Sequence, residues 1–355
     1  MGDPTKSGFE ITAEMPDERL LIIHQGALGD FVVTFPVLKA LATLYPRIDG
    51  ICRSSFGRLA IDLGVLESAF ALESARFASL YTDRIAPAVG TLVSAYGSHL
   101  LFSFSEALEK SMRKIAGGRV FRIHPWPRGA DRSHITAFLS RQLLACGLLE
   151  GDARRRFARA LSHLKAAASG KGRCGKRIIV APGAGSIEKR WPLAGFVQVA
   201  AELERRGLNP LILLGPAEDD LQAELKKCPV WHGPIVKPAA FRELVSALES
   251  AAGYIGNDSG VGHLAAFLGL PTLVIFGPSD PVRWRPFGNH VRIVHAPISC
   301  SPCFGREERA CRREGACFKK ITPDRVLAAF EEMVGRQSGG LETIQTRRTG
   351  DFPAP

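Results

Sequence analysis

The sequence predicts an α/β protein made of two Rossmann-like domains whose parallel sheets face each other across a cleft. Short apolar runs typical of buried strands alternate with segments of helical periodicity, which is the pattern of a doubly wound parallel sheet. A strand, a glycine loop and a helix open the chain, and the same order recurs after residue 176. A small, polar, glycine-bearing stretch typical of a linker lies between the two runs. We therefore expect domains at 19–164 and 177–332, a linker at 165–176 and a mobile tail at 336–355.

Length and composition agree with this organisation. A chain of 355 residues suggests two domains, and 46% hydrophobic with 23% charged residues excludes a disordered protein. Lys and Arg number 46 against 35 Asp and Glu, so the formal net charge is +11. That charge favours anionic partners such as phosphorylated substrates or acidic lipid surfaces. No aromatic-basic motif indicates nucleic acid, so we predict no nucleic-acid partner.

Hydropathy indicates a cytoplasmic protein. The longest apolar stretch, 264–276, is shorter than the ~20 residues needed to span a bilayer. The first residues are polar and partly acidic, without the apolar core of a secretory signal. We expect membrane contact to be peripheral at most and to act through charge.

The first candidate site follows the strand predicted at 19–24. Gly26 and Gly29 would let a ligand or another backbone approach closely, and helical spacing resumes around Pro36, where the helix starts or kinks. Asp30 falls at or near a helix N-terminus, either as an N-cap carboxylate or as a cleft-facing carboxylate able to accept a proton. The dinucleotide fingerprint G-x-G-x-x-G is absent.

The second half repeats the pattern with a strand at 177–181, a loop at 182–186 and a helix at 193–206. Lys189 and Arg190 follow the loop and could hold a phosphate, or form a solvated pair beside a core tryptophan. Beyond the next strand, Glu218 and Asp219 open a helix, where acids favour the dipole. One of them could instead bind the ribose hydroxyls of a nucleotide.

The richest motif, 256–263, lies between a strand and an amphipathic helix. Small residues there leave backbone N–H groups free at the positive end of the helix, which is how proteins bind phosphate. Capping alone is the alternative, and the glycine density favours phosphate. The nucleophile elbow G-x-S-x-G and the P-loop lysine are both missing. The candidate residues are Asp258, Ser259, Gly260, Gly262 and His263.

Four cysteines cluster near the C-terminus. Four thiols within 18 residues could bind zinc, but two of the three spacings are not those of paired C-x-x-C ligands. Free thiols or a transient disulfide are the alternative, and we predict no metal. The cysteines are Cys300, Cys303, Cys311 and Cys317.

Together these motifs resemble glycosyltransferase family 9, the heptosyltransferases of lipopolysaccharide core synthesis. The similar blocks are IIHQGALGDFVVTFPVLKALATLYP near the start, APGAG and EKRWP in the middle, and GNDSGVGHLAAFLGLPTLVIFGPSDP later. The CSPC segment and ITPDRVLAAF are similar as well. The blocks cover about residues 19–332 in the family's order, although His24 and Gln25 stand where relatives often carry Lys or Arg.

The resemblance implies a GT-B fold, with the acceptor in the N-terminal domain and an ADP-sugar in the C-terminal one. It implies an inverting transfer of a heptose, or a related sugar, to a lipopolysaccharide inner-core acceptor, with no metal or cofactor. Asp30 matches the proposed general base and Lys189 the donor-phosphate lysine. Asp219 or Glu218 falls near the ribose-binding acid, and the phosphate loop matches Asp258, Ser259, Gly260 and His263.

Two alternative functions stay open on the residues alone. Two Rossmann-like halves would also suit an NAD-dependent oxidoreductase, although the missing fingerprint weakens it. The other is a non-catalytic nucleotide- or sugar-binding protein of the same fold. The cation-rich stretch 110–132 could face an anionic lipid-linked acceptor at the inner leaflet, or form an ordinary solvated face.

Overall fold

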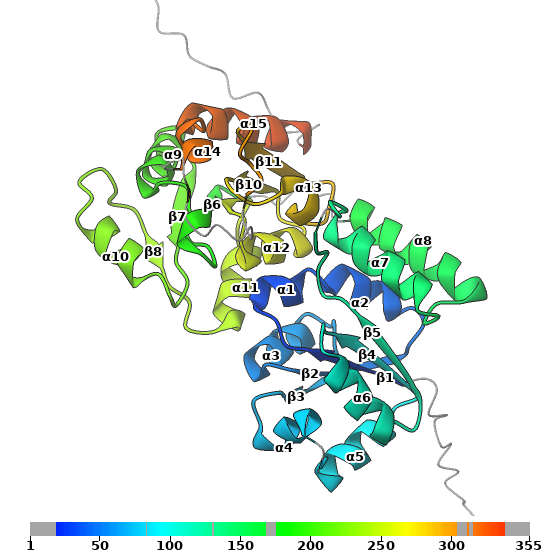
Figure 1. The fold of residues 1–355 in the computed structure, drawn as a ribbon. Helices are drawn as coiled ribbons and strands as arrows, with labels where there is room; N and C mark the ends of the chain where they lie inside the picture. Colours follow the sequence, from blue (N-terminus) through cyan, green and yellow to red (C-terminus); the bar gives the residue numbers. More distant parts are fainter. Residues whose placement is uncertain are drawn as a thin grey trace, which may run out of the picture.

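The computed structural model describes residues 19–82, 84–129, 131–167, 175–303, 311 and 315–337. Two separate parallel sheets, each flanked by helices, make up the two halves of the molecule (Figure 1). This arrangement confirms the predicted α/β class with two Rossmann-like sheets. Most of the predicted linker and tail lies outside the described residues; the described part of 165–176 includes the end of a long helix.

The first sheet has the order β3-β2-β1-β4-β5, with every pair parallel. Its central strand is fully buried from Leu20 to Ile23 because helices cover both faces. The chain moves outward in one direction from β1 to β3 and in the other from β4 to β5, so β1 and β4 flank the switch point where ligands bind. The strands are β1 (Arg19–His24), β2 (Arg47–Cys52), β3 (Ser68–Ala71), β4 (Ser98–Phe102) and β5 (Arg119–Ile123).

Two short helices, α1 and α2, follow the first glycine loop. The helix expected near Pro36 begins at Phe35, and the additional α1 precedes it. Helices α7 and α8 pack beside α2 (Figure 1). The helices of this half are α1 (Leu28–Val32), α2 (Phe35–Leu41), α3 (Ser54–Asp62), α4 (Ala75–Ala78), the 3₁₀ turn η2 (Ser79–Tyr81), α5 (Pro87–Ser94), α6 (Glu106–Ile115), α7 (Ile135–Ala145) and α8 (Gly151–Ala167).

The second sheet has the order β11-β10-β9-β6-β7-β8, again parallel throughout, with its switch point between β6 and β9. Its strands are β6 (Arg177–Ala181), β7 (Asn209–Leu213), β8 (Ile235–Val236), β9 (Gly253–Asn257), β10 (Thr272–Phe276) and β11 (Val291–His295). Its helices are η3 (Ile187–Lys189), α9 (Leu193–Arg205), α10 (Asp219–Lys226), α11 (Phe241–Glu249), α12 (Gly260–Phe267), α13 (Pro281–Trp284), α14 (Ala316–Lys319) and α15 (Pro323–Gln337).

The two halves meet through helices that follow the strands. Helix α1 packs on α12 and α3 packs on α11. Aromatic rings cross this boundary: Phe35 contacts Phe267 with ring centroids 5.2 Å apart, and Phe56 contacts Phe241 at 5.8 Å. At the rim, Arg132 forms a two-pronged ion pair with Asp280 at 2.7 and 3.0 Å. The carboxyl ends of both sheets therefore face the same boundary.

Within the described ranges, no helix combines the length and the apolar character that a membrane span requires.

One charged side chain is buried in the first half, away from this boundary. Asp49 is fully buried and accepts hydrogen bonds from the Tyr96 hydroxyl (2.7 Å), Arg47 Nε (2.8 Å) and both the amide and hydroxyl of Ser68 (3.0 and 2.8 Å). Burial alone would raise the pKa of Asp49, but these hydrogen bonds outweigh it and lower the pKa.

Replacing Asp49 by alanine should lower the free energy of unfolding at pH 7 by about 3–5 kcal/mol, because buried donors lose their acceptor. The pKa of Asp49 in the folded protein lies below the ~3.9 of an unfolded aspartate, so ionisation of Asp49 stabilises the fold. This stabilisation is complete above that pH and is lost as the pH falls through the pKa of the folded protein. Urea denaturation should show a constant gap between wild type and Asp49→Ala above about pH 5, and a shrinking gap below pH 4. Exposed Asp152→Ala is the control; a gap that is as large in strong acid as at pH 7 contradicts this account.

Candidate active site between the two halves

The glycine loops of the two halves touch. A Cβ atom added to Gly260 would lie 2.9 Å from the backbone nitrogen of Gly29, closer than real Cβ contacts. A Cβ on Gly29 would lie 3.6 Å from Gly260. The starts of α1 and α12 therefore approach backbone to backbone, which explains the glycine at position 260. Two motifs that are 230 residues apart in the sequence therefore lie side by side in the structure.

Asp30 is the third residue of α1, and its Oδ2 accepts the Ala27 N–H at 3.2 Å. The N-cap itself is Ala27, so the N-cap interpretation of Asp30 is wrong; the carboxylate reaches back to cap from inside the helix. Burial raises the pKa of Asp30, while the Ala27 hydrogen bond and the positive charge of Lys189 oppose the rise. The charge of Lys189 in the second half thus acts to lower the pKa of Asp30 in the first half.

Lys189 ends the short 3₁₀ turn η3, and its Nζ donates to Asp258 Oδ2 at 2.9 Å. The Asp258 side chain is 7% exposed and follows β9 directly. The Asp258 carboxylate is thus engaged with the lysine ammonium. The sequence placed both residues in the site but did not predict this pairing.

The loop after β9 caps α12. Ser259 is the N-cap, and its hydroxyl accepts the Gly262 N–H at 3.4 Å, so capping by serine is present. Capping leaves other N–H groups of the first turn without partners inside the helix, as at any helix start. This turn is the one in contact with Gly29, and it therefore faces the boundary between the halves.

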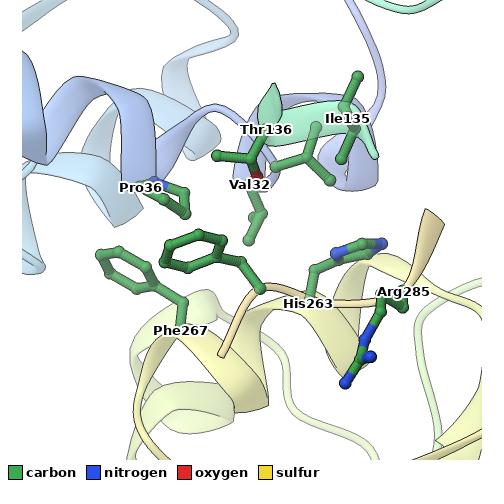
Figure 2. A pocket seen from close by; sticks show the side chains of 9 residues that line it. Val32, Pro36, Ile135, Thr136, His263, Phe267 and Arg285 are labelled. Atoms are coloured by element: carbon green, nitrogen blue, oxygen red, sulfur yellow. The ribbon is translucent and has the colours of Figure 1, made fainter. Parts of the chain in front are cut away.

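His263 lies one turn into α12 and is buried. Burial lowers its pKa to about 4; the charge of Asp258 opposes this shift, whereas those of His134 and Lys189 add to it. Figure 2 shows His263 and Phe267 facing Val32 and Pro36 of the other half. The cavity there has a volume of about 10 Å³, far below that of a ligand pocket, so these contacts form an apolar seam between the halves.

The acidic residues at the start of α10 differ in burial: Glu218 is buried, whereas the neighbouring Asp219 is exposed. Glu218 is buried, accepts the Gly215 N–H at 2.6 Å and lies against Gly183, where an added Cβ would overlap its carboxylate. Burial raises the pKa of Glu218. Asp219 is exposed and pairs with Lys237 at 2.5 Å. Of the two candidates, Glu218 is the one that lies against the loop after β6.

Sequence reasoning missed Asn257. This side chain is fully buried at the end of β9; its Oδ1 accepts the Trp191 N–H at 3.0 Å, and its Nδ2 donates to the Pro182 carbonyl at 2.8 Å. It fixes the segment that carries Lys189 to the strand that directly precedes Asp258. An amide at the carboxyl end of an otherwise apolar strand was the available signal.

Three arginines of the cation-rich stretch 110–132 form ion pairs within the protein. Arg113 and Arg122 both bind Glu109, which lies just outside the stretch, and Arg132 binds Asp280 of the other half. Their charge is therefore partly compensated within the protein, and the orientation of the stretch toward an anionic acceptor stays a prediction.

All described cysteines are free, including Cys300, Cys303, Cys311 and Cys317. Among the side chains that the structure places, no group of three or more His, Cys, Asp or Glu is arranged to hold a metal ion. Cys311 Sγ instead accepts the Gly315 N–H at 3.3 Å.

Two parallel sheets whose carboxyl edges meet at one boundary define the GT-B fold class. The sequence profile of glycosyltransferase family 9 (heptosyltransferase) matches residues 132–312, just over half of the chain. The chain belongs to this family. The profile covers Lys189, Glu218 and the 256–263 loop but not Asp30.

Curated relatives align over part of their length. Lipopolysaccharide heptosyltransferase 1 of Pseudomonas aeruginosa is 26% identical over 160 residues, which are 42% of this chain and 45% of that protein. Lipopolysaccharide heptosyltransferase 3 of Escherichia coli is 32% identical over 118 residues, 32% of this chain and 35% of the relative. The chain thus spans between a third and a half of the length of these two relatives.

Solved structures share the fold at low identity. A family 9 glycosyltransferase from Veillonella parvula gives a TM-score of 0.66 at 16% identity, over 90% of this chain and 97% of the other. The E. coli ADP-heptose lps heptosyltransferase II gives 0.65 at 17%, over 90% and 99%. The dodecameric iron-containing heptosyltransferase TibC, in complex with ADP-D-beta-D-heptose, gives 0.54 at 14%, over 91% and 77%.

The approach of the two loops is testable by adding one methyl group. Gly260→Ala should push α1 and α12 apart, since the atom in its way is backbone and cannot rotate aside. Hydrogen exchange at residues 28–32 and 260–267 should rise, because the packed unit loses local stability. Gly335→Ala in α15, where a Cβ meets nothing within 4 Å, is the matched control. Unchanged exchange in both segments of the Gly260 variant would contradict the contact.

Proposed function

We propose that this protein is an inverting glycosyltransferase that moves a heptose, or a related sugar, from an ADP-sugar to a lipopolysaccharide inner-core acceptor. The N-terminal domain, 19–164, would bind the acceptor and the C-terminal domain, 177–332, the donor. Family membership and relatives named as lipopolysaccharide heptosyltransferases support this proposal. The observation that carries it is the contact of Gly29 with Gly260, which places Asp30 of one half where the charge of Lys189 of the other half acts on it.

The reaction proposed is a single displacement. The Asp30 carboxylate takes the proton of an acceptor hydroxyl, and that oxygen forms a bond to the anomeric carbon of the donor. The bond from this carbon to the diphosphate breaks, and ADP leaves with the electron pair, which inverts the anomeric centre. Burial raises the pKa of Asp30 and makes the carboxylate a stronger base than a solvated aspartate.

The second half would stabilise the negative charge that grows on the leaving diphosphate. Lys189, held by Asp258, supplies a fixed cation, and the first turn of α12 around Gly260 and Gly262 supplies N–H groups. These groups can do the work of a divalent cation, so we propose metal-independent transfer. Glu218, buried beside Gly183 and Gly215, is our candidate for the ribose hydroxyls, in preference to Asp219.

The family favours transfer over the alternative of an NAD-dependent oxidoreductase. A non-catalytic binding protein of the same fold would bind ADP without turnover, so an activity assay with ADP-heptose and a core acceptor separates the two. We propose a cytoplasmic location, with peripheral contact to the inner leaflet where a lipid-linked acceptor would lie. No nucleic-acid partner is proposed.

Asp30→Asn should reduce kcat by roughly 10²–10⁴, because the amide can still accept the Ala27 N–H but cannot take a proton. ADP binding should be unchanged, since the proposed donor site lies in the other half. In the wild type, kcat should fall as the pH drops below the raised pKa of Asp30. Exposed Asp152→Asn is the control. Normal turnover by Asp30→Asn would mean that another group is the base.

Lys189→Ala should weaken donor use and reduce the thermal stabilisation by ADP, because the fixed cation is gone. In a panel of ADP, UDP, GDP and NAD, the wild type should be stabilised most by ADP. EDTA should leave both the shift and the turnover intact. Exposed Lys226→Ala is the matched control. Unchanged donor kinetics in Lys189→Ala would remove Lys189 from the site. A larger thermal shift with NAD than with ADP would favour the oxidoreductase, and inhibition by EDTA would contradict metal-independence.

A further inference from the structure

His24, the last residue of β1, uses both ring nitrogens to bind the backbone that carries Asp30. Its side chain is buried, with 1% of the residue exposed. Nδ1 accepts the Gly26 N–H at 3.3 Å, and Nε2 lies 3.1 Å from the Asp30 carbonyl oxygen. Because an N–H only donates and a carbonyl only accepts, the proton must be on Nε2. One ring therefore joins the strand end, the glycine loop and the first turn of α1.

Packing holds this ring in place. The His24 ring lies 5.0 Å from Phe31 and 5.8 Å from Phe102, measured between centroids. The loop closes tightly around it: a Cβ on Gly26 would lie 2.9 Å from His24 Cε1 and 2.8 Å from Asp30 Cβ. Burial lowers the pKa of His24 to about 4, so the ring is neutral at pH 7 and keeps its tautomer.

The same ring is connected to the other half of the protein. Phe31 packs edge-on against Phe35 at 5.1 Å, and Phe35 packs against Phe267 of α12 at 5.2 Å. A continuous row of packed rings thus runs from the helix of the proposed donor site to His24. The position of the first turn of α1 depends on this row and on the two hydrogen bonds of His24.

We propose that His24 is the positioning residue of the base: its Nε2–H bond to the Asp30 backbone sets where the Asp30 carboxylate points. The inference rests on the proposed role of Asp30. His24 cannot touch substrate, because it is buried and both nitrogens are engaged. It acts by holding the base within reach of the acceptor hydroxyl, and a displacement of about 1 Å can cost 10²-fold in rate.

The chain offers a matched control in His99. This histidine is fully buried in β4, next to β1, and its ring nitrogens lie 2.9 Å from the Val93 carbonyl and 3.1 Å from the Arg119 carbonyl. It pairs with Leu21 in the sheet register, three residues before His24 and away from the carboxyl edge. His99 therefore lies buried against backbone carbonyls, as a second histidine of the same sheet, but contacts no segment of the site.

The experiment compares three substitutions at His24. Glutamine places an amide N–H near the position of Nε2 and keeps the bond to Asp30. Asparagine places its amide oxygen near Nδ1 and keeps only the bond to Gly26, and leucine keeps neither. We expect kcat to fall by roughly 10- to 100-fold in His24→Asn and His24→Leu, and much less in His24→Gln. Donor KM and the ADP-induced thermal shift should not change, which also shows that the variants are folded.

A double variant separates positioning from a structural role. If His24 acts only through Asp30, then His24→Leu combined with Asp30→Asn should be no slower than Asp30→Asn alone. His99→Leu should lower the melting temperature without changing the kcat of the folded protein. The inference is overturned if His24→Leu keeps wild-type kcat or if all three substitutions lower kcat equally. It is also overturned if the fold-losses in kcat of His24→Leu and Asp30→Asn multiply in the double variant, or if His99→Leu lowers kcat to the same extent as His24→Leu.

The proposed function and this inference can fail separately. Full activity of Asp30→Asn would remove the proposed base, whatever the His24 variants do. An impaired Asp30→Asn together with an unimpaired His24→Leu would leave the base in place and remove only its positioning by His24.

Discussion

The backbone contact between Gly29 and Gly260 fixes the geometry of everything around it. Each glycine belongs to the first turn of a helix that follows a strand of its own sheet, and position 260 has no room for a side chain against the backbone of Gly29. Asp30 is one residue beyond the contact on one side, and Ser259 one residue before it on the other. The contact thus brings the carboxyl edges of the two separate sheets together, and the residues of the proposed reaction lie along the line where these edges meet.

The charged residues along this line act on one another in sequence, from Asp258 through Lys189 to Asp30. Asp258 holds Lys189, and the charge of Lys189 in turn opposes the burial that raises the pKa of Asp30. Asn257 ties the lysine-bearing segment to β9, so the cation is placed by backbone and not by a free surface side chain. A burial-raised carboxylate and a fixed cation on opposite walls suit a reaction that takes up a proton on one side and develops negative charge on the other.

The sequence predicted what depends on local pattern. Strand, glycine loop and helix in both halves, and the candidates Asp30, Lys189 and 256–263, follow from spacing and residue type. It could not separate Glu218 from Asp219, because the two are adjacent and only packing against Gly183 buries one of them.

Long-range partners were equally invisible to sequence reasoning. The fold pairs Arg122 with Glu109 of α6. It pairs Arg132 with Asp280, which is 148 residues away in the sequence. His24 was noted only as a departure from the family, since its role depends on a tautomer and two backbone contacts that no motif encodes.

The boundary between the halves combines an apolar interior with a charged rim, and dissolved salts act on these in opposite directions. Arg132 is 57% exposed, so mobile ions screen its attraction to Asp280. Sulfate and phosphate, in contrast, strengthen the burial of rings such as Phe35 and Phe267. At equal ionic strength the two halves should therefore resist separation more strongly in sulfate than in chloride, because both salts screen the charged rim and only sulfate also strengthens the apolar contacts.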